Sequence, residues 1–157
     1  MLRFIPIDVD EKANEQFAGH PECEQILAIF TDHYKKVGYE LPWIAYFFSD
    51  DQGELIGGGG FKGAPINGKI EISYGTFEKH QRRGVATQIC RELINLALET
   101  DPSVIITART LPDNLASIRV LEKNSFVNRG LIYDEEDGDV FEFVFKRDAE
   151  TDTETQK

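Results

Sequence analysis

Cysteine is scarce in this chain of 157 residues, and its scarcity excludes two classes of protein. Cys23 and Cys90 each fall in a stretch with helical spacing. Two separated cysteines cannot make a disulfide framework, and a cysteine-ligated zinc site needs clustered ligands. The three histidines, His20, His33 and His80, are scattered as well, so the sequence predicts no metal site.

Positive charge is also in short supply, because 17 Lys and Arg residues oppose 28 Asp and Glu residues and leave a net charge of −11. Such an acidic chain repels phosphate backbones, which argues against nucleic-acid binding. No run approaches the ~20 consecutive apolar residues that span a bilayer, and residues 1–10 lack the basic start and apolar stretch of a secretion signal. We therefore expect a cytoplasmic protein with no membrane or nucleic-acid partner.

The rest of the composition, 41% hydrophobic and 29% charged, is typical of one globular domain with a substantial core. Alternating, β-branched or aromatic segments predict strands at residues 2–7, 43–48, 55–61, 69–77, 104–107, 126–133 and 140–145. Helical spacing predicts helices within residues 10–37, from residue 84 onward and at residues 114–123. Residues 1–147 are thus one predicted domain, and the acidic tail 148–157, which has no large apolar side chain, is predicted to be disordered.

The order of these elements indicates a mixed sheet, because an antiparallel meander is followed by a strand, helix, strand unit. Pro21 interrupts the first helical stretch, so we expect two helices there rather than one. One face of the second helix collects Ile26, Ile29, Phe30 and Tyr34, which we expect to pack on the core.

Two glycine-rich segments imitate phosphate-binding loops in the wrong context. Residues 58–63 have the letters of a dinucleotide-binding fingerprint, yet they run through a predicted strand rather than from a strand into a helix. Residues 63–69 nearly spell a P-loop, but Ile70 stands where a Ser or Thr must bind magnesium, and a strand follows. Neither segment predicts a nucleotide site.

A third segment, Gln81-Arg82-Arg83-Gly84-Val85-Ala86-Thr87, directly follows a predicted strand and opens an amphipathic helix. Gly84 and Ala86 have little or no side chain, so backbone N–H groups can approach an anion closely, and the helix dipole adds positive potential. Lys79 and His80 extend the segment into the most basic patch of the chain. The segment therefore fits a phosphate cradle, with a solvated helix start as the alternative.

This segment, the preceding Ile70-Glu71-Ile72-Ser73-Tyr74-Gly75 and the later residues 114–126 together resemble the GNAT superfamily of acetyl-CoA-dependent N-acetyltransferases. The narrower resemblance is to the branch that includes the ribosomal-protein N-terminal acetyltransferases, and it covers nearly the whole chain before the tail. It implies an α/β (α+β) fold with a mixed, mostly antiparallel central sheet of about six to seven strands flanked by helices. It also implies acetyl-CoA as co-substrate and an amine acceptor, and it allows a homodimer.

The resemblance also implies roles for single residues. Residues 81–86 would bind the coenzyme A pyrophosphate through backbone N–H groups, and Gly75 with Thr76 would pair with the pantetheine arm where the sheet splays. Asn114 matches a cofactor-contacting Asn, and Ser117 matches a Ser that hydrogen-bonds the sulfur or protonates the leaving thiolate; a capped helix start is the alternative for both. The predicted cofactor-binding residues are Gly75, Thr76, Gln81, Arg82, Arg83, Gly84, Val85, Ala86, Thr87, Asn114 and Ser117.

Three positions depart from the family's pattern. Many relatives have a Tyr as general acid where this chain has Leu121, so that role is absent or belongs to Ser117 or Tyr133. Glu78 replaces a frequent Pro, and Ser125 replaces a frequent Gly before a Phe.

Glu71 and Ser117 are the predicted catalytic residues. Direct transfer needs a neutral amine, so the site must remove a proton from an ammonium, and the family commonly has a carboxylate near the position of Glu71. A free glutamic acid titrates near ~4.3, so efficient base work requires burial that raises the pKa. The alternative for Glu71 is an outward-facing strand residue.

The acceptor stays open between a peptide N-terminus and a small amine. At pH 7 the neutral form costs a lysine amine about 3 to 4 kcal/mol more than an α-amine, so a weak base suffices for an N-terminus. The acidic turn 134–139 either attracts a cationic substrate or is a solvated hairpin turn. Tyr39, Trp43 and Tyr133 either line the acceptor cleft or belong to the core.

The sequence thus predicts an N-acetyltransferase that moves an acetyl group from acetyl-CoA to a primary amine in a ternary complex. A non-catalytic acyl-CoA-binding module, suggested by Leu121, is the first alternative. An acetyltransferase that detoxifies small amines is the second, and it differs from the first hypothesis in its acceptor alone.

Overall fold

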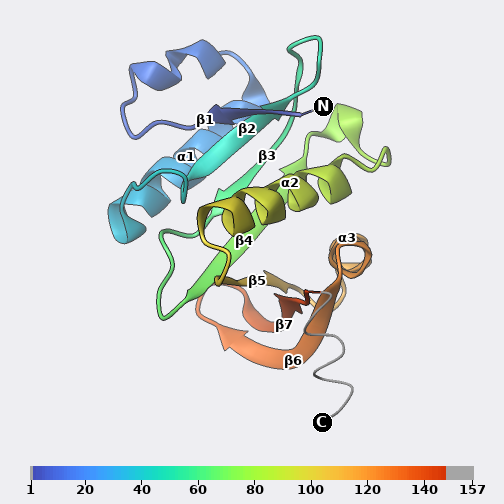
Figure 1. Cartoon of the computed structure of the whole chain (residues 1–157). Helices are drawn as coiled ribbons and strands as arrows, with labels where there is room; N and C mark the ends of the chain where they lie inside the picture. Colours follow the sequence, from blue (N-terminus) through green and yellow to red (C-terminus); the bar gives the residue numbers. More distant parts are fainter. Residues whose placement is uncertain (1, 148–157) are drawn as a thin grey trace.

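A seven-stranded sheet organises residues 2–147, the part of the chain that the computed structural model describes (Figure 1). The strands are β1 (Arg3–Pro6), β2 (Ala45–Ser49), β3 (Leu55–Phe61), β4 (Lys69–Thr76), β5 (Ile105–Thr110), β6 (Phe126–Asp134) and β7 (Gly138–Phe145). Their order is β1-β2-β3-β4-β5-β7-β6, and every neighbouring pair is antiparallel except β4 with β5. The predicted mixed, mostly antiparallel fold is confirmed, whereas the predicted tail 148–157 lies outside the described residues.

Three α-helices and two short 3₁₀ helices accompany the sheet: α1 (Pro21–Val37), α2 (Val85–Thr100), α3 (Leu115–Lys123), η1 (Ala13–Phe17) and η2 (Glu78–His80). Pro21 is the first residue of α1, where a helix needs no N–H donor. The predicted division of this stretch at Pro21 is therefore confirmed. Figure 1 shows α2 lying across β3 and β4.

The glycines of β3 show that α1 and α2 cover opposite faces of the sheet. A methyl group built on Gly57 would lie 2.8 Å from Cδ1 of Ile89 in α2, whereas one built on Gly58 would lie 3.6 Å from Cδ1 of Ile26 in α1. Successive strand residues point to opposite faces, so the two helices sandwich β3. The glycine run is thus the interior of a central strand, in agreement with the rejection of a nucleotide fingerprint there.

The predicted burial of Ile29 and the predicted end of the fifth strand need correction. Ile29 was expected in the core, but 64% of its surface is exposed, because it stands on the side of α1 that borders a cleft. Tyr34 is buried as predicted, and its hydroxyl donates to the carbonyl of Ile7 at 2.8 Å and accepts from the N–H of Ala45 at 3.0 Å. The fifth strand extends beyond the predicted end at Thr107, because residues 107–110 pair with β7.

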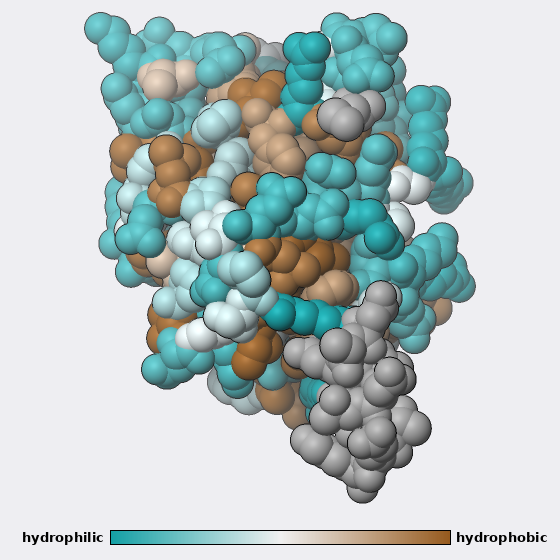
Figure 2. Space-filling view, in the orientation of Figure 1, coloured by the Kyte–Doolittle hydropathy of each residue, from teal (hydrophilic) through white to brown (hydrophobic). Residues whose placement is uncertain are grey.

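The sheet separates between β4 and β5. Residues 69–72 of β4 pair with residues 105–108 of β5, but beyond them β4 pairs with β3 and β5 pairs with β7. Among residues 2–147, the second half of β4 therefore has one edge without a strand partner. Figure 2 shows a mainly hydrophilic face with an apolar patch near its centre, just below α2.

Ser125 occupies a left-handed backbone conformation, with φ of +67°, directly after the end of α3. The side chain is exposed, and αL backbone costs a non-glycine residue about 1–2 kcal/mol, only part of which the extra chain entropy of glycine offsets. We expect Ser125→Gly to stabilise the protein by about 0.5–1 kcal/mol. Thermal unfolding should show a rise in Tm of roughly 1–4 °C.

Glu122→Gly is the control for this prediction, because Glu122 is exposed within α3 and its φ is not positive. There the substitution should lower stability by up to about 1 kcal/mol. A Tm for Ser125→Gly at or below that of the native protein would contradict the prediction.

Candidate active site

The N-terminus of α2 has the features of an anion cradle. Gly84 precedes the helix with φ of +76°, no side chain caps the first turn, and no acidic residue lies in it. The N–H groups of Val85, Ala86 and Thr87 have no acceptor within the helix, as at every helix start. They therefore point, with the positive end of the helix dipole, toward the space in front of Gly84.

The basic patch around this cradle is smaller than predicted. Arg82 and Arg83 are exposed and make no ion pair with residues 2–147. His80 is instead buried, with Nε2 2.6 Å from a carboxylate oxygen of Glu54, and Lys79 lies 3.4 Å from the other oxygen. His80 thus braces η2 against the β2–β3 hairpin, and the two arginines carry the positive charge of the cradle.

The unpartnered edge of β4 leads into this cradle. The N–H of Lys62 donates to the carbonyl of Glu71, and the N–H of Phe77 donates to the carbonyl of Ile56. The backbone N–H and C=O groups of the odd-numbered residues of β4 therefore point toward β3. Hydrogen-bonding direction alternates along an antiparallel ladder, so Gly75 faces β3 while Tyr74 and Thr76 turn their backbone groups to the β5 side. Of the predicted pair Gly75 and Thr76, it is therefore Thr76 whose backbone groups lie at the unpartnered edge, together with those of Tyr74.

Asn114 and Ser117 lie together at the start of α3. The side-chain oxygen of Asn114 accepts the N–H of Ser117 at 3.1 Å, so the capping interpretation of Asn114 is confirmed. The Ser117 hydroxyl lies 3.3 Å from the hydroxyl of Tyr74, which also donates to the Ser117 carbonyl at 3.5 Å. Burial raises the pKa of Tyr74, so this phenol remains protonated at physiological pH.

The two other positions considered for a general acid differ sharply in exposure. Leu121 is fully buried, so its position in α3 faces the core. Tyr133 is 73% exposed on β6, at the border of a cleft on the other side of the sheet. Neither offers a hydroxyl to Ser117, whereas Tyr74, which sequence reasoning missed, lies within hydrogen-bond distance of it.

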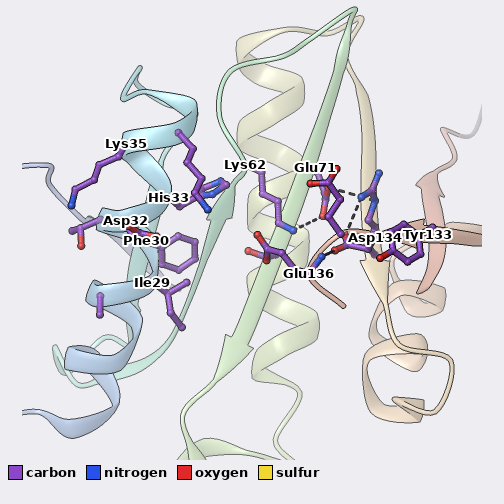
Figure 3. A pocket seen from close by; sticks show the side chains of 16 residues that line it. Ile29, Phe30, Asp32, His33, Lys35, Lys62, Glu71, Tyr133, Asp134 and Glu136 are labelled. Atoms are coloured by element: carbon purple, nitrogen blue, oxygen red, sulfur yellow. Dashed lines mark hydrogen bonds and ion pairs between the residues drawn. The ribbon is translucent and has the colours of Figure 1, made fainter. Parts of the chain in front are cut away.

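That cleft lies between α1 and the sheet and has a volume of about 1140 Å³. Residues 28–33, 35 and 36 of α1 form one wall, and Arg109 with residues 133–136 forms the other, with Lys62, Glu71 and Ser73 between them. Figure 3 shows Glu71 and Asp134 across the cleft from the side chains of α1, with Lys62 reaching toward them. Glu71 and Ser73 therefore face α1, while Tyr74 faces α2 and α3.

Glu71 is surrounded by cations within this cleft. Its side chain is 18% exposed, with Lys62 Nζ 2.7 Å from Oε2 and Arg109 Nε 3.7 Å from Oε1. Strand alternation thus places Glu71 in the cleft as a largely buried carboxylate rather than outward in solvent. A carboxylate can accept a proton from a group that enters the cleft.

Arg109 connects three acidic side chains. It lies 3.0 Å from Asp134, 3.7 Å from Glu71 and 3.6 Å from Glu142. Burial opposes its charge, but the hydrogen bond to Asp134 and the nearby carboxylates outweigh burial and raise the guanidinium pKa. A lone arginine in the otherwise apolar and threonine-rich β5 was the available signal, since a charge on a half-buried strand needs partners.

The acidic turn is partly structural. Burial opposes ionisation of Asp134, but the N–H of Glu136 and the Arg109 guanidinium outweigh burial and lower its pKa. Asp134 also accepts the N–H of Asp137, so it holds the turn together, while Glu135 and Glu136 border the cleft.

Of the three aromatic residues considered for the cleft, two pack with the core and one borders the cleft. Trp43 is buried against Phe61, and Tyr39 packs on Tyr34, each pair with ring centroids 5.1 Å apart. Both belong to the core region, and Tyr133 is the aromatic residue of the three that borders the cleft.

His33 also borders the cleft and was not predicted as a site residue. Burial, reinforced by the charge of Lys62, lowers the pKa of His33, so its imidazole is neutral at pH 7. Its Nε2 is buried and has no hydrogen-bond partner among residues 2–147. A neutral imidazole is a competent proton acceptor, so His33 is a second candidate base.

Within residues 2–147, no cluster of three or more His, Cys, Asp or Glu side chains is arranged to hold a metal ion. None of the helices in this part of the chain has the length and apolar character that a membrane crossing requires.

Comparison with known proteins begins with sequence. The family model described as an acetyltransferase (GNAT) domain matches residues 4–127. A segment of 78 residues is 44% identical to the uncharacterized N-acetyltransferase YjdG of Bacillus subtilis, and it covers 49% of this chain and 46% of that protein. The aligned segment thus spans about half the length of the curated relative.

Solved structures match over nearly the whole chain. RimL, the ribosomal L7/L12 alpha-N-protein acetyltransferase in complex with coenzyme A, has a TM-score of 0.68 and 20% identity, with 94% of this chain and 95% of that chain covered. A chimera of the Vibrio cholerae spermidine N-acetyltransferase SpeG and hSSAT has a TM-score of 0.68 and 16% identity, with 96% and 98% covered. An acetyltransferase from Agrobacterium tumefaciens has a TM-score of 0.65 and 19% identity, with 93% and 91% covered. These structures share the fold, and because the family model matches most of the sequence, the chain belongs to the GNAT acetyltransferase family.

Proposed function

We propose that this protein is an acetyl-CoA-dependent N-acetyltransferase that moves the acetyl group directly to a primary amine in a ternary complex. One observation carries the proposal, which is that three features meet at β4. Glu71 lies in the cleft on one face of the strand, and Tyr74 contacts Ser117 on the other face. The unpartnered edge of the strand leads to the uncapped N-terminus of α2. An anion site and a proton acceptor at one strand are what acyl transfer from a phosphorylated thioester to an amine requires.

The residues at this end of β4 fit acetyl-CoA, which supplies the activated acyl group. The first-turn N–H groups of α2, with Arg82 and Arg83, would bind the pyrophosphate. The backbone groups of Tyr74 and Thr76 would bond the amide arm as a missing strand would. Bound in this way, the cofactor would have its thioester beside Ser117.

The acceptor amine would enter through the cleft, on the side of Glu71. Glu71 would take the proton of the ammonium, directly or through water, so that the neutral amine attacks the thioester carbonyl. The structural neighbours named for an α-N-protein acceptor and for spermidine represent the two acceptor classes that we consider, a peptide N-terminus and a small amine. Both cations and carboxylates border the cleft, so its charge does not separate them.

A non-catalytic acyl-CoA-binding module is the second candidate. The buried Leu121 favours it, because the position at which many relatives have an acid here contributes to the core. This candidate predicts saturable binding of acetyl-CoA without transfer to any amine.

A cytoplasmic location is part of the proposal. Both cysteines are buried and unpaired, which suits a reducing compartment.

Arg83→Glu should weaken the binding of acetyl-CoA about tenfold, because it replaces a charge-assisted hydrogen-bond donor to phosphate by a repelling carboxylate. Calorimetric titration of the purified protein measures this affinity. Arg83 is exposed, so the reversal of charge should leave the fold intact.

Lys69→Glu is the matched control for this experiment, because Lys69 is an exposed cation at the opposite end of β4 from the cradle. It reverses the same charge about 20 Å along the strand and should leave the affinity within about twofold. Equal losses in the two variants would indicate a general effect of net charge and would contradict the cradle.

Release of coenzyme A thiol in the presence of peptide N-termini, polyamines and small primary amines tests the transfer itself. Turnover with any of these classes supports the enzyme and identifies its acceptor class. Binding without turnover across the panel would favour the binding module instead.

A further inference from the structure

Tyr74 is a polar side chain of β4 that no predicted role includes. It lies on the face of the sheet that carries α2 and α3, opposite the face of Glu71, and is partly buried. Two oxygens of Ser117, 43 residues away in sequence, are within hydrogen-bond distance of its hydroxyl. A phenol that lies beside Ser117, the candidate hydrogen-bond donor to the leaving thiolate, therefore needs an explanation.

The phenol of Tyr74 has one proton and two neighbouring oxygens of Ser117 that can accept it. The carbonyl oxygen, at 3.5 Å, can only accept. Between the two hydroxyl oxygens, 3.3 Å apart, either can be the donor, and the arrangement with Tyr74 as the donor leaves the hydroxyl proton of Ser117 free to point elsewhere. Asn114 fixes the serine from the other side through the backbone N–H.

We propose that Tyr74 is a positioning residue that holds Ser117 so that its hydroxyl donates a hydrogen bond to the sulfur of the leaving thiolate. The inference rests on the proposed function. It gives an indirect role in stabilising the leaving thiolate to Tyr74, because the aliphatic Leu121 has no group that could do so. Tyr74 acts through Ser117 and does not touch the reacting atoms.

The chemical step balances without a proton from Tyr74. The acceptor ammonium gives one proton to Glu71, its nitrogen forms the N–C bond, and the C–S bond breaks with its electron pair going to sulfur. The nitrogen releases its second proton to solvent, Glu71 afterwards returns its proton to solvent, and the thiolate takes one proton from solvent. A serine hydroxyl is a much weaker acid than a thiol, so Ser117 stabilises the thiolate by a hydrogen bond and keeps its proton.

A double-mutant cycle with Tyr74→Phe, Ser117→Ala and the double variant tests this coupling. We expect Tyr74→Phe to lower kcat about tenfold, with the KM for acetyl-CoA and the calorimetric affinity within about twofold, because the lost interaction acts mainly in the transition state. Ser117→Ala should lower kcat by about ten- to a hundredfold. The double variant should be no slower than Ser117→Ala, because Tyr74 acts through that hydroxyl.

Tyr46→Phe is the control, because it removes the same hydroxyl group from another tyrosine of the sheet, in β2, where the hydroxyl donates to the Pro42 carbonyl at 2.7 Å. It should cost a similar amount of thermal stability and leave kcat unchanged. Additive losses in the cycle, or a loss of affinity as large as the loss of kcat, would mean that Tyr74 has only a structural role and would overturn the inference.

The outcomes also separate this inference from the proposed function. An active native enzyme with an unimpaired Tyr74→Phe variant overturns the role of Tyr74 alone. A native protein that binds acetyl-CoA and acetylates no amine overturns both.

Discussion

Glu71→Gln should lower kcat by about 100- to 10,000-fold, the range that general-base catalysis supplies. The substitution keeps the size of the side chain and removes its ability to accept a proton. Glu71 is the carboxylate between the two walls of the cleft, and it is largely buried. Steady-state acetylation of the best acceptor from the amine panel measures the loss, with thermal unfolding in parallel.

Glu142→Gln is the matched control, because Glu142 also lies beside Arg109, at 3.6 Å, but does not border the cleft. It removes one ion pair of the guanidinium without removing the candidate base. Its kcat should stay within about threefold of the native value, in keeping with the small contribution of a partly exposed ion pair.

Unchanged turnover in Glu71→Gln would remove Glu71 as the base. His33 would then be the base to test, since its imidazole is neutral and half-buried in the same cleft. Similar losses in the Glu71 and Glu142 variants would instead show that the charge network around Arg109, and not proton transfer, accounts for the effect.

The parts of the site that the sequence predicted are local in the chain. The cradle needs Gly84, a strand before it and a helix after it, and these features lie within a few residues of one another. The cap of α3 is equally local, since Asn114 and Ser117 are three residues apart. Backbone conformation and helix capping follow from neighbouring residues, so a sequence pattern can identify them.

The parts that the sequence did not predict depend on contacts between distant residues. Glu71 in β4 pairs with Lys62, which directly follows β3, and with Arg109 in β5. Tyr74 contacts Ser117, which is 43 residues away in sequence. Periodicity says which residues share a face of a strand, but not which strand lies next to it. The partner of a charged strand residue therefore becomes visible only once the sheet order is known.

The same limit explains the errors. Helical spacing grouped Ile29 with the core residues of α1, but spacing does not show where the sheet ends and the cleft begins. His80 counted toward the basic patch because its neighbours in sequence are basic, whereas its partner is Glu54 in a hairpin.

Gly57→Ala should destabilise the protein by about 2–3 kcal/mol, the upper range for overpacking a core. An added methyl group would overlap the carbonyl oxygen of Gly75 and lie 2.8 Å from Cδ1 of Ile89 and 3.3 Å from the Cα of Thr76. Two of the three close neighbours are backbone atoms of β4, which cannot turn away as the Ile89 side chain of α2 can. Relief requires β4 to move, and this strand carries one edge of the candidate cofactor site.

Gly58→Ala separates this effect from the general cost of a side chain in β3, because its added methyl group would find its nearest neighbour at 3.4 Å, an ordinary contact. Chemical denaturation should show Gly58→Ala within about 0.5 kcal/mol of the native protein. Where Gly57→Ala still folds, it should also bind acetyl-CoA more weakly, since its strain falls on Gly75 and Thr76, in the half of β4 that carries the proposed cofactor edge. Equal stabilities for the two variants would contradict the close approach of α2 and β4 to β3, because that approach is what makes position 57 differ from position 58.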